Sequence, residues 1–261
     1  MVERKKAIGN FIILIGTLLI NSLGASGQIN NYSQKEVSDK FPTLITPNPG
    51  TFSIWGIIYM FLIVSIVLMI IKSNDLQYKK IINAITLKFW IASLFNILWI
   101  ISFSYLQLEL SVLLIFGLLI SLLSILKSIE TFNTKKTLLL PITFGLYAGW
   151  IFVATIVNIS ATLVKLKWNR FYLSENFWAS LTLIVAVILI YLITLKIKNA
   201  VFPLPIAWAF YGINNQLQSS NVLTNQYMIL KYIALGGAVA LIIIAIYQFY
   251  KNNYNLIPSV K

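Results

Sequence analysis

The sequence predicts an all-α fold, a polytopic integral membrane helix bundle with about eight transmembrane helices. Of its 261 residues, 59% are hydrophobic and only 10% are charged, whereas a soluble domain carries about 25% charged residues. The mean hydropathy is +0.84. The apolar residues form runs of about 20 residues, the length at which a helix crosses a hydrocarbon core of about 30 Å.

The composition also excludes several classes of function. The chain contains neither Cys nor His, which excludes disulfides, thiol catalysis, thiolate metal sites and imidazole ligands. No acidic residue lies deep in a predicted helix, so very little acid–base chemistry is left for an enzyme. The net charge of +13 is spread over the gaps between apolar runs and forms no basic stripe for a nucleic acid. We therefore expect a non-enzymatic protein of the lipid bilayer, without a cofactor or a metal site.

The first apolar run extends from Ala7 to about Ala25 and follows a basic start. A basic start, an apolar core and the sequence Ala25-Ser26-Gly27 also fit a cleaved signal peptide. The length of the run favours a first membrane helix. The polar loop that follows carries balanced charge, and its Ser33–Lys40 portion is predicted to form a short helix at the surface.

Seven further apolar runs predict the remaining spans. They are expected at Phe52–Ile71, about Ile82–Leu106, about Leu108–Leu126, about Leu138–Leu163, about Asn176–Leu195, Phe202 to about Gln216, and about Gln226–Tyr250. Lys88 lies near the basic end of its helix and can extend its ammonium group to the interface. Eight spans place both termini on the same side of the membrane.

The distribution of basic residues predicts which side that is. With both termini inside, thirteen basic residues fall in inside segments and five in outside loops. The inside residues are Arg4, Lys5, Lys6, Lys72, Lys79, Lys80, Lys127, Lys135, Lys136, Lys196, Lys198, Lys251 and Lys261. The outside residues are Lys35, Lys40, Lys165, Lys167 and Arg170. Because cytoplasmic loops are enriched in Lys and Arg, we expect a plasma-membrane protein with both termini in the cytoplasm.

The stretch Pro47–Tyr59 joins the polar loop to the second apolar run. Its prolines and glycine prevent the helix from extending back into the loop, and Thr51 or Ser53 is expected to cap the helix. Trp55 and Tyr59 are four residues apart and share one helix face. Two interpretations stay open: the pair anchors this end at the membrane interface, or it lines a cavity between helices.

Two other predicted helices carry polar and aromatic residues inside the membrane. In the helix at 82–106, Asn96 and Trp99 share a face, with Phe103 a turn further. In the helix at 138–163, one continuous stripe consists of Tyr147, Trp150, Ala154 and Asn158. A buried amide costs several kcal/mol unless it is hydrogen-bonded, so Asn96 and Asn158 should face protein or a cavity. A purely structural role as interhelical hydrogen bonds, worth about 1 kcal/mol each, remains the alternative.

Gly145 and Gly149 lie four residues apart in the same predicted helix. Small residues at this spacing allow two helix backbones to approach closely in a membrane. We therefore expect this face of the helix to pack tightly against a neighbour.

In order and in helix placement, these three motifs resemble the TspO/translocator-protein family (tryptophan-rich sensory protein, TspO/MBR). They are Trp55-x-x-x-Tyr59, Asn96-x-x-Trp99-x-x-x-Phe103 and Tyr147-x-x-Trp150-x-x-x-Ala154-x-x-x-Asn158. The resemblance covers residues 1–164 and is closest to the larger bacterial relatives with extra C-terminal helices. It implies a TspO-like five-helix core at 1–164 and three additional transmembrane helices at 165–261. Position 146 is Leu where the family has Pro, and no Trp precedes the first motif.

The resemblance also implies a function and a site. Family members bind porphyrins and other lipophilic ligands in a cavity between helices and are often homodimers. The ligand-binding residues that the resemblance implies are Trp55, Tyr59, Asn96, Trp99, Phe103, Tyr147, Trp150, Ala154 and Asn158. The expected function is to bind, carry or sense a lipophilic planar ligand such as a porphyrin, haem or another tetrapyrrole. The alternative is a secondary transporter of another small molecule, although the helices show no paired intramembrane carboxylates and no convincing inverted repeat.

Overall fold

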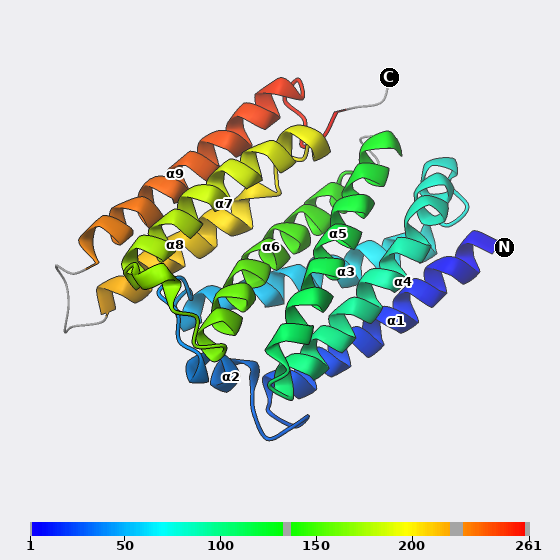
Figure 1. Cartoon of the computed structure of the whole chain (residues 1–261). Helices are drawn as coiled ribbons and strands as arrows, with labels where there is room; N and C mark the ends of the chain where they lie inside the picture. The colour runs from blue at the N-terminus through cyan, green and yellow to red at the C-terminus, as the bar shows by residue number, and fades with distance from the viewer. Residues whose placement is uncertain (1, 133–136, 220–226, 259–261) are drawn as a thin grey trace.

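The protein is a bundle of long helices that run along a common direction (Figure 1). The structure is a computed structural model and describes residues 2–132, 137–219 and 227–258, in which no strand occurs. The helix α1 begins and the helix α9 ends at the same end of the bundle, and α2 lies at the opposite end (Figure 1). The all-α helix-bundle prediction is confirmed, and the side of the membrane on which the termini lie stays a prediction.

The described helices follow the predicted order. They are α1 (Val2–Ala25), α2 (Gln34–Lys40), the 3-10 turn η1 (Pro49–Ser53), α3 (Ile54–Ile71), α4 (Leu76–Ser104), α5 (Leu108–Phe132), α6 (Leu139–Lys165), the 3-10 turn η3 (Arg170–Tyr172), α7 (Glu175–Ile197), α8 (Pro203–Ser219) and α9 (Met228–Lys251). Seven of them are long and apolar enough to cross a membrane. The helix α8 has 17 described residues, at the lower limit for a span, so one of the eight predicted spans does not reach the usual length.

The packing order shows how the C-terminal helices join the first five spans. The helix α4 packs against α1 and α5, and α6 packs against α5 and α3. On its other side α6 contacts α8, which packs against α9, and α9 packs against α7 (Figure 1). One cluster of buried apolar side chains extends through both parts of the chain. The division at residue 164 into a core and an added part stays a prediction.

Two glycines of α6 make close contact with the α7–α8 junction. A Cβ atom on Gly149 would lie 2.3 Å from the carbonyl oxygen of Phe202, and one on Gly145 would lie 2.7 Å from Oδ1 of Asn199. Asn199 also donates a hydrogen bond from Nδ2 to the carbonyl oxygen of Pro141 at 2.9 Å. The predicted close packing of this face is therefore confirmed, and its neighbour is the start of α8.

The first helix is tied to α4 by buried polar groups. Asn10 donates from Nδ2 to Oγ1 of Thr86 at 3.2 Å and accepts at Oδ1 from Nε1 of Trp90 at 2.8 Å. Asn10 itself is fully buried. Such contacts favour the membrane-helix interpretation of this segment over the signal peptide, because they make α1 part of the packed bundle.

The short helix predicted in the first loop is present as α2. Its N-cap Ser33 and Glu36 form a reciprocal capping box, in which Ser33 Oγ accepts from the Glu36 N–H at 3.2 Å and Glu36 Oε2 accepts from the Ser33 N–H at 2.7 Å. The hydrogen bond from the Ser33 backbone, with a second from its hydroxyl, lowers the pKa of Glu36. This box explains why a seven-residue helix forms in a polar loop.

The expected cap of α3 is wrong. Ser53 makes no capping hydrogen bond and has φ −56° and ψ −21°, a helical conformation, whereas an N-cap residue needs an extended one. The 3-10 turn η1 precedes α3, so the chain is already helical at Ser53. Thr51 donates its hydroxyl to the side chain of Asn48 instead. The backbone oxygen of Thr51 accepts from Nε1 of Trp208 at 3.0 Å, which ties this turn to α8.

The predicted start of the next span, Ile82, is also too late. Asp75 caps α4 by accepting hydrogen bonds at Oδ1 from the backbone N–H groups of Gln77 and Tyr78, at 2.8 and 3.3 Å. Helix α4 therefore begins at Leu76, because an N-cap carboxylate starts a helix regardless of where the hydrophobic run begins.

Candidate functional site

An aromatic cluster joins α3 to α6. Trp55 stacks on Tyr59 with ring centroids 5.1 Å apart and an interplanar angle of 27°. Trp55 also meets Tyr147 and Trp150 edge-on at 6.2 and 6.3 Å, and Phe52 meets Trp150 edge-on at 5.7 Å. These are the favoured geometries of aromatic pairs. The Trp55 and Tyr59 pair thus faces another helix and not only the membrane interface.

A chain of hydrogen bonds runs beside this cluster and joins four helices. Tyr59 of α3 donates its hydroxyl to Oδ1 of Asn21 in α1 at 3.2 Å. Asn21 donates from Nδ2 to Oδ1 of Asn96 in α4 at 2.5 Å. Asn96 donates from Nδ2 to the hydroxyl of Tyr147 in α6 at 2.9 Å. This polar chain satisfies amide groups whose burial without partners would be costly.

The central member of that chain, Asn21, is not among the predicted site residues. It lies in the first apolar run, and the residue is 5% exposed. The sequence does contain a signal: Asn10, Thr17 and Asn21 recur at spacings of seven and four, which places them on one helix face. All three are buried in the structure.

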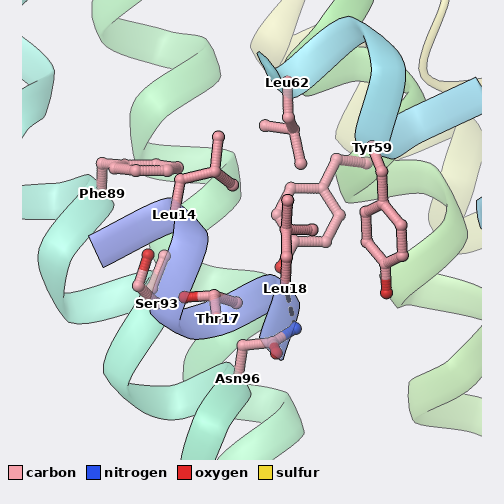
Figure 2. Close-up of a pocket in the computed structure, with 10 residues that line it drawn as sticks. Leu14, Thr17, Leu18, Tyr59, Leu62, Phe89, Ser93 and Asn96 are labelled. Atoms are coloured by element: carbon pink, nitrogen blue, oxygen red, sulfur yellow. Dashed lines mark hydrogen bonds between the residues drawn. The ribbon is translucent and has the colours of Figure 1, made fainter. Parts of the chain in front are cut away.

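The polar chain borders a small cavity between α1, α3, α4 and α6 (Figure 2). Its lining consists of Leu14, Thr17, Leu18, Tyr59, Leu62, Phe89, Ala92, Ser93, Asn96 and Tyr147. We call it the inner cavity. Its volume is about 10 Å³, which is about the space that one water molecule needs. Pockets for drug-sized ligands measure about 300–1,000 Å³, so the bundle has no room for a planar ligand here in this arrangement.

The structure brings some of the predicted site residues together and separates others. Tyr59, Asn96 and Tyr147 line the inner cavity. Trp55 adjoins it through ring contacts with both tyrosines, and Trp150 contacts Trp55 in turn. Their ligand-binding role stays a prediction.

Trp99 and Phe103 do not line the inner cavity. Their rings are 6.4 Å apart, and Phe103 packs in a separate cluster with Val37 of α2, Leu108 and Ala161. This cluster lies under α2 at the end of the bundle away from the termini. Nε1 of Trp99 is buried and has no hydrogen-bond partner among the described residues.

Asn158 and Ala154 also lie away from the inner cavity. Asn158 of α6 exchanges hydrogen bonds with Ser111 of α5, at 2.9 Å from Nδ2 to Oγ and at 3.0 Å from Oγ to Oδ1. This pair fits the structural role of an interhelical hydrogen bond. Ala154 is partly buried and packs against the main apolar core.

The fold and this arrangement define a polytopic helical membrane protein whose aromatic and amide side chains gather between the helices. A family model described as TSPO-like protein matches residues 7–247. The chain therefore belongs to the TSPO-like family, and the match extends beyond residue 164 through most of the C-terminal helices. No curated protein and no solved structure matches the chain.

Proposed function

We propose that this protein binds a lipophilic planar ligand, such as a porphyrin, between α1, α3, α4 and α6, and thereby carries or senses it. The observation that supports the proposal is the aromatic cluster of Trp55, Tyr59, Tyr147 and Trp150 beside a polar chain. Flat, polarisable rings are suitable partners for a planar apolar ligand. The amide groups of Asn21 and Asn96 would orient its polar substituents, as a few convergent polar groups do in most ligand pockets.

Binding requires the inner cavity to open, since it has a volume of only about 10 Å³. The pair of Trp55 and Tyr59 is the natural moving part, because Trp55 is only partly buried and stacks on its own helix neighbour. A planar ligand would replace the stacking of Trp55 on Tyr59 with stacking of Trp55 on the face of the ligand. Trp150, which is 2% exposed, would stay in place as the fixed wall.

The experiment is a titration of the purified full chain in phosphatidylcholine nanodiscs with protoporphyrin IX, followed by porphyrin absorbance and fluorescence. Trp55→Ala should weaken binding by about tenfold, equivalent to about 1.4 kcal/mol. Tyr191→Ala is the control, because Tyr191 is an aromatic residue of α7 that is 40% exposed and is absent from the aromatic cluster.

Trp150→Phe is a second variant. It keeps an aromatic ring in the core and should therefore disturb folding less than alanine would. It should weaken porphyrin binding, whereas Tyr191→Ala should leave it unchanged. The proposal fails if porphyrin binds to Trp55→Ala and to Trp150→Phe as tightly as to the unchanged chain.

A further inference from the structure

A second, much larger pocket lies at the end of the bundle away from the termini. It has a volume of about 660 Å³, within the range of pockets that hold small molecules. The first loop, the end of α6 and the start of α7 form its walls, and we call it the outer pocket. Its lining consists of Pro42, Thr43, Leu44, Ile45, Ser160, Leu163, Val164, Lys167, Trp168, Arg170, Glu175, Trp178, Ala179 and Thr182.

Two tryptophans form an aromatic wall of this pocket. The rings of Trp168 and Trp178 are 4.8 Å apart at an angle of 60°. Nε1 of Trp178 donates a hydrogen bond to the backbone oxygen of Arg170 at 2.8 Å, so its indole is held in one orientation. Leu44 and Leu163 add apolar lining from the first loop and from α6. Such walls suit an apolar body with a flat face.

The lining of this pocket carries more positive than negative charge. Lys167 and Arg170 are cationic, and Glu175 is the acidic lining residue. Glu175 pairs with Arg170 at 3.4 Å. Among the described residues, the Lys167 ammonium has no carboxylate within ion-pair distance. The pocket therefore offers one uncompensated positive charge next to an apolar, aromatic interior.

The backbone that presents these cations adopts a conformation that L-residues rarely use. Lys167 and Arg170 have φ values of +51° and +56°, and Phe171 and Tyr172 follow at +50° and +61°. Left-handed backbone at non-glycine residues is unfavourable and persists where the surroundings hold it. Here Asn169 accepts the Phe171 N–H at Oδ1 at 3.1 Å, which helps to fix the turn that positions Arg170.

We propose that the outer pocket binds a small amphiphilic carboxylate, with the apolar body against Trp168 and Trp178 and the anionic group at Lys167. Charge complementarity and the mixed lining carry this assignment. The site is separate from the inner cavity, with which it shares no lining residue. It therefore stands or falls independently of porphyrin binding between α1, α3, α4 and α6.

The test uses two probes with the same pyrene body and chain length, the anionic 1-pyrenebutyrate and the neutral 1-pyrenebutanol. Energy transfer from tryptophan to pyrene measures binding to the full chain in phosphatidylcholine nanodiscs, with empty discs as the blank. The chain should bind the carboxylate more tightly than the alcohol, and added salt should reduce this preference because salt screens exposed charges.

Single charge changes then locate the site. Lys167→Gln should weaken pyrenebutyrate binding by about fivefold, the size typical of a partly exposed charge pair, and leave pyrenebutanol binding unchanged. Glu175→Gln removes the opposing carboxylate and should tighten pyrenebutyrate binding, an effect that a folding defect cannot imitate. Lys35→Gln is the matched control, because Lys35 lies on α2 and pairs with Asp39 outside the pocket lining.

Two results would overturn the proposal. One is equal pyrenebutyrate affinity in Lys167→Gln, Glu175→Gln and the unchanged chain. The other is loss of pyrenebutyrate binding in discs that contain phosphatidylglycerol, since competition by that lipid would assign the pocket to an anionic headgroup and not to a small amphiphile.

Discussion

The inner cavity and the outer pocket differ in what fills the space between their aromatic side chains. Around the inner cavity, Trp55, Tyr59, Tyr147 and Trp150 contact one another and the volume left is about 10 Å³. At the outer pocket, the rings of Trp168 and Trp178 contact each other and that of Phe171, and about 660 Å³ beside them stays open. A cluster of tryptophans is therefore no measure of an open site: aromatic side chains can seal a cavity as well as line one.

One helix takes part in both regions. The middle of α6 supplies Tyr147 and Trp150 to the inner cluster, and its last turns supply Leu163 and Val164 to the outer pocket. Gly149 holds the middle of this helix against the start of α8. The middle of α6 is therefore closely packed, whereas its last turns border open space.

The largest difference is expected between two tryptophan truncations. Trp150→Ala removes a side chain that is 2% exposed and should lower the free energy of unfolding by about 3–5 kcal/mol. Trp178→Ala removes a partly exposed indole and should cost about 1 kcal/mol. Denaturant unfolding in detergent, followed by circular dichroism, compares the two variants. Equal losses would contradict the distinction between a sealed and an open cluster.

A smaller loss is expected at the contact between α6 and α8. Gly149→Ala places a methyl group against the carbonyl oxygen of Phe202 and should destabilise the protein by about 1–3 kcal/mol, as overpacking does. Gly236→Ala is the matched control on α9, where a Cβ atom meets nothing within 4 Å, and it should be neutral or stabilising. Thermal unfolding of both variants measures the difference, and a neutral Gly149→Ala would refute the tight contact.

Substitution of two asparagines compares the polar chain of the inner cavity with an ordinary interhelical hydrogen bond. Asn96→Ala breaks hydrogen bonds with Asn21 and Tyr147 and should cost about 1–2 kcal/mol. Asn158→Ala should cost about 0.5–1 kcal/mol, because Ser111 keeps its bond to the carbonyl oxygen of Leu108. Unfolding in detergent ranks the two variants. A larger loss at Asn158 would show that the chain through Asn96 is not the stronger network.

The smallest effect concerns pH and α2, which is followed by the loop that borders the outer pocket. The pKa of Glu36 is lowered from its ordinary value of 4.5 by the capping box. The stabilisation is therefore present above pH 4.5 and is lost as the pH falls through the lowered pKa. Hydrogen exchange of α2 amides should rise on acidification in that range. In Glu36→Gln, the exchange rates of the α2 amides, corrected for their intrinsic pH dependence, should not change over that range.

Much of the fold was predictable, because it depends on the lengths of apolar runs and on local capping. The spans and the helix at Ser33–Lys40 follow from signals within a few residues, including the capping box of Ser33 and Glu36. The ends of helices were less predictable. Asp75 starts α4 before its apolar run begins, and the 3-10 turn η1 removes Ser53 from its expected role as a cap.

The contacts among the candidate site residues were predictable only in part, because motifs within one helix do not determine which helix lies opposite. The spacing of Trp55 and Tyr59 correctly placed them on one face, and the structure adds their contacts with α6. Asn158 shares the stripe of Tyr147 yet bonds to α5. Asn21 was not predicted, because two amides scattered in a long apolar run leave its hydropathy high. The outer pocket forms from distant segments that no local pattern connects.

The most direct test of the contrast between the two regions is the accessibility of single cysteines, which this cysteine-free chain makes simple. Ser93→Cys places a thiol in the inner cavity, where Ser93 is 4% exposed, and Ser160→Cys places one in the outer pocket. In nanodiscs without added ligand, a water-soluble maleimide should label Ser160→Cys quickly and Ser93→Cys slowly or not at all. Labelling of Ser93→Cys as fast as that of Ser160→Cys would contradict a sealed inner cavity.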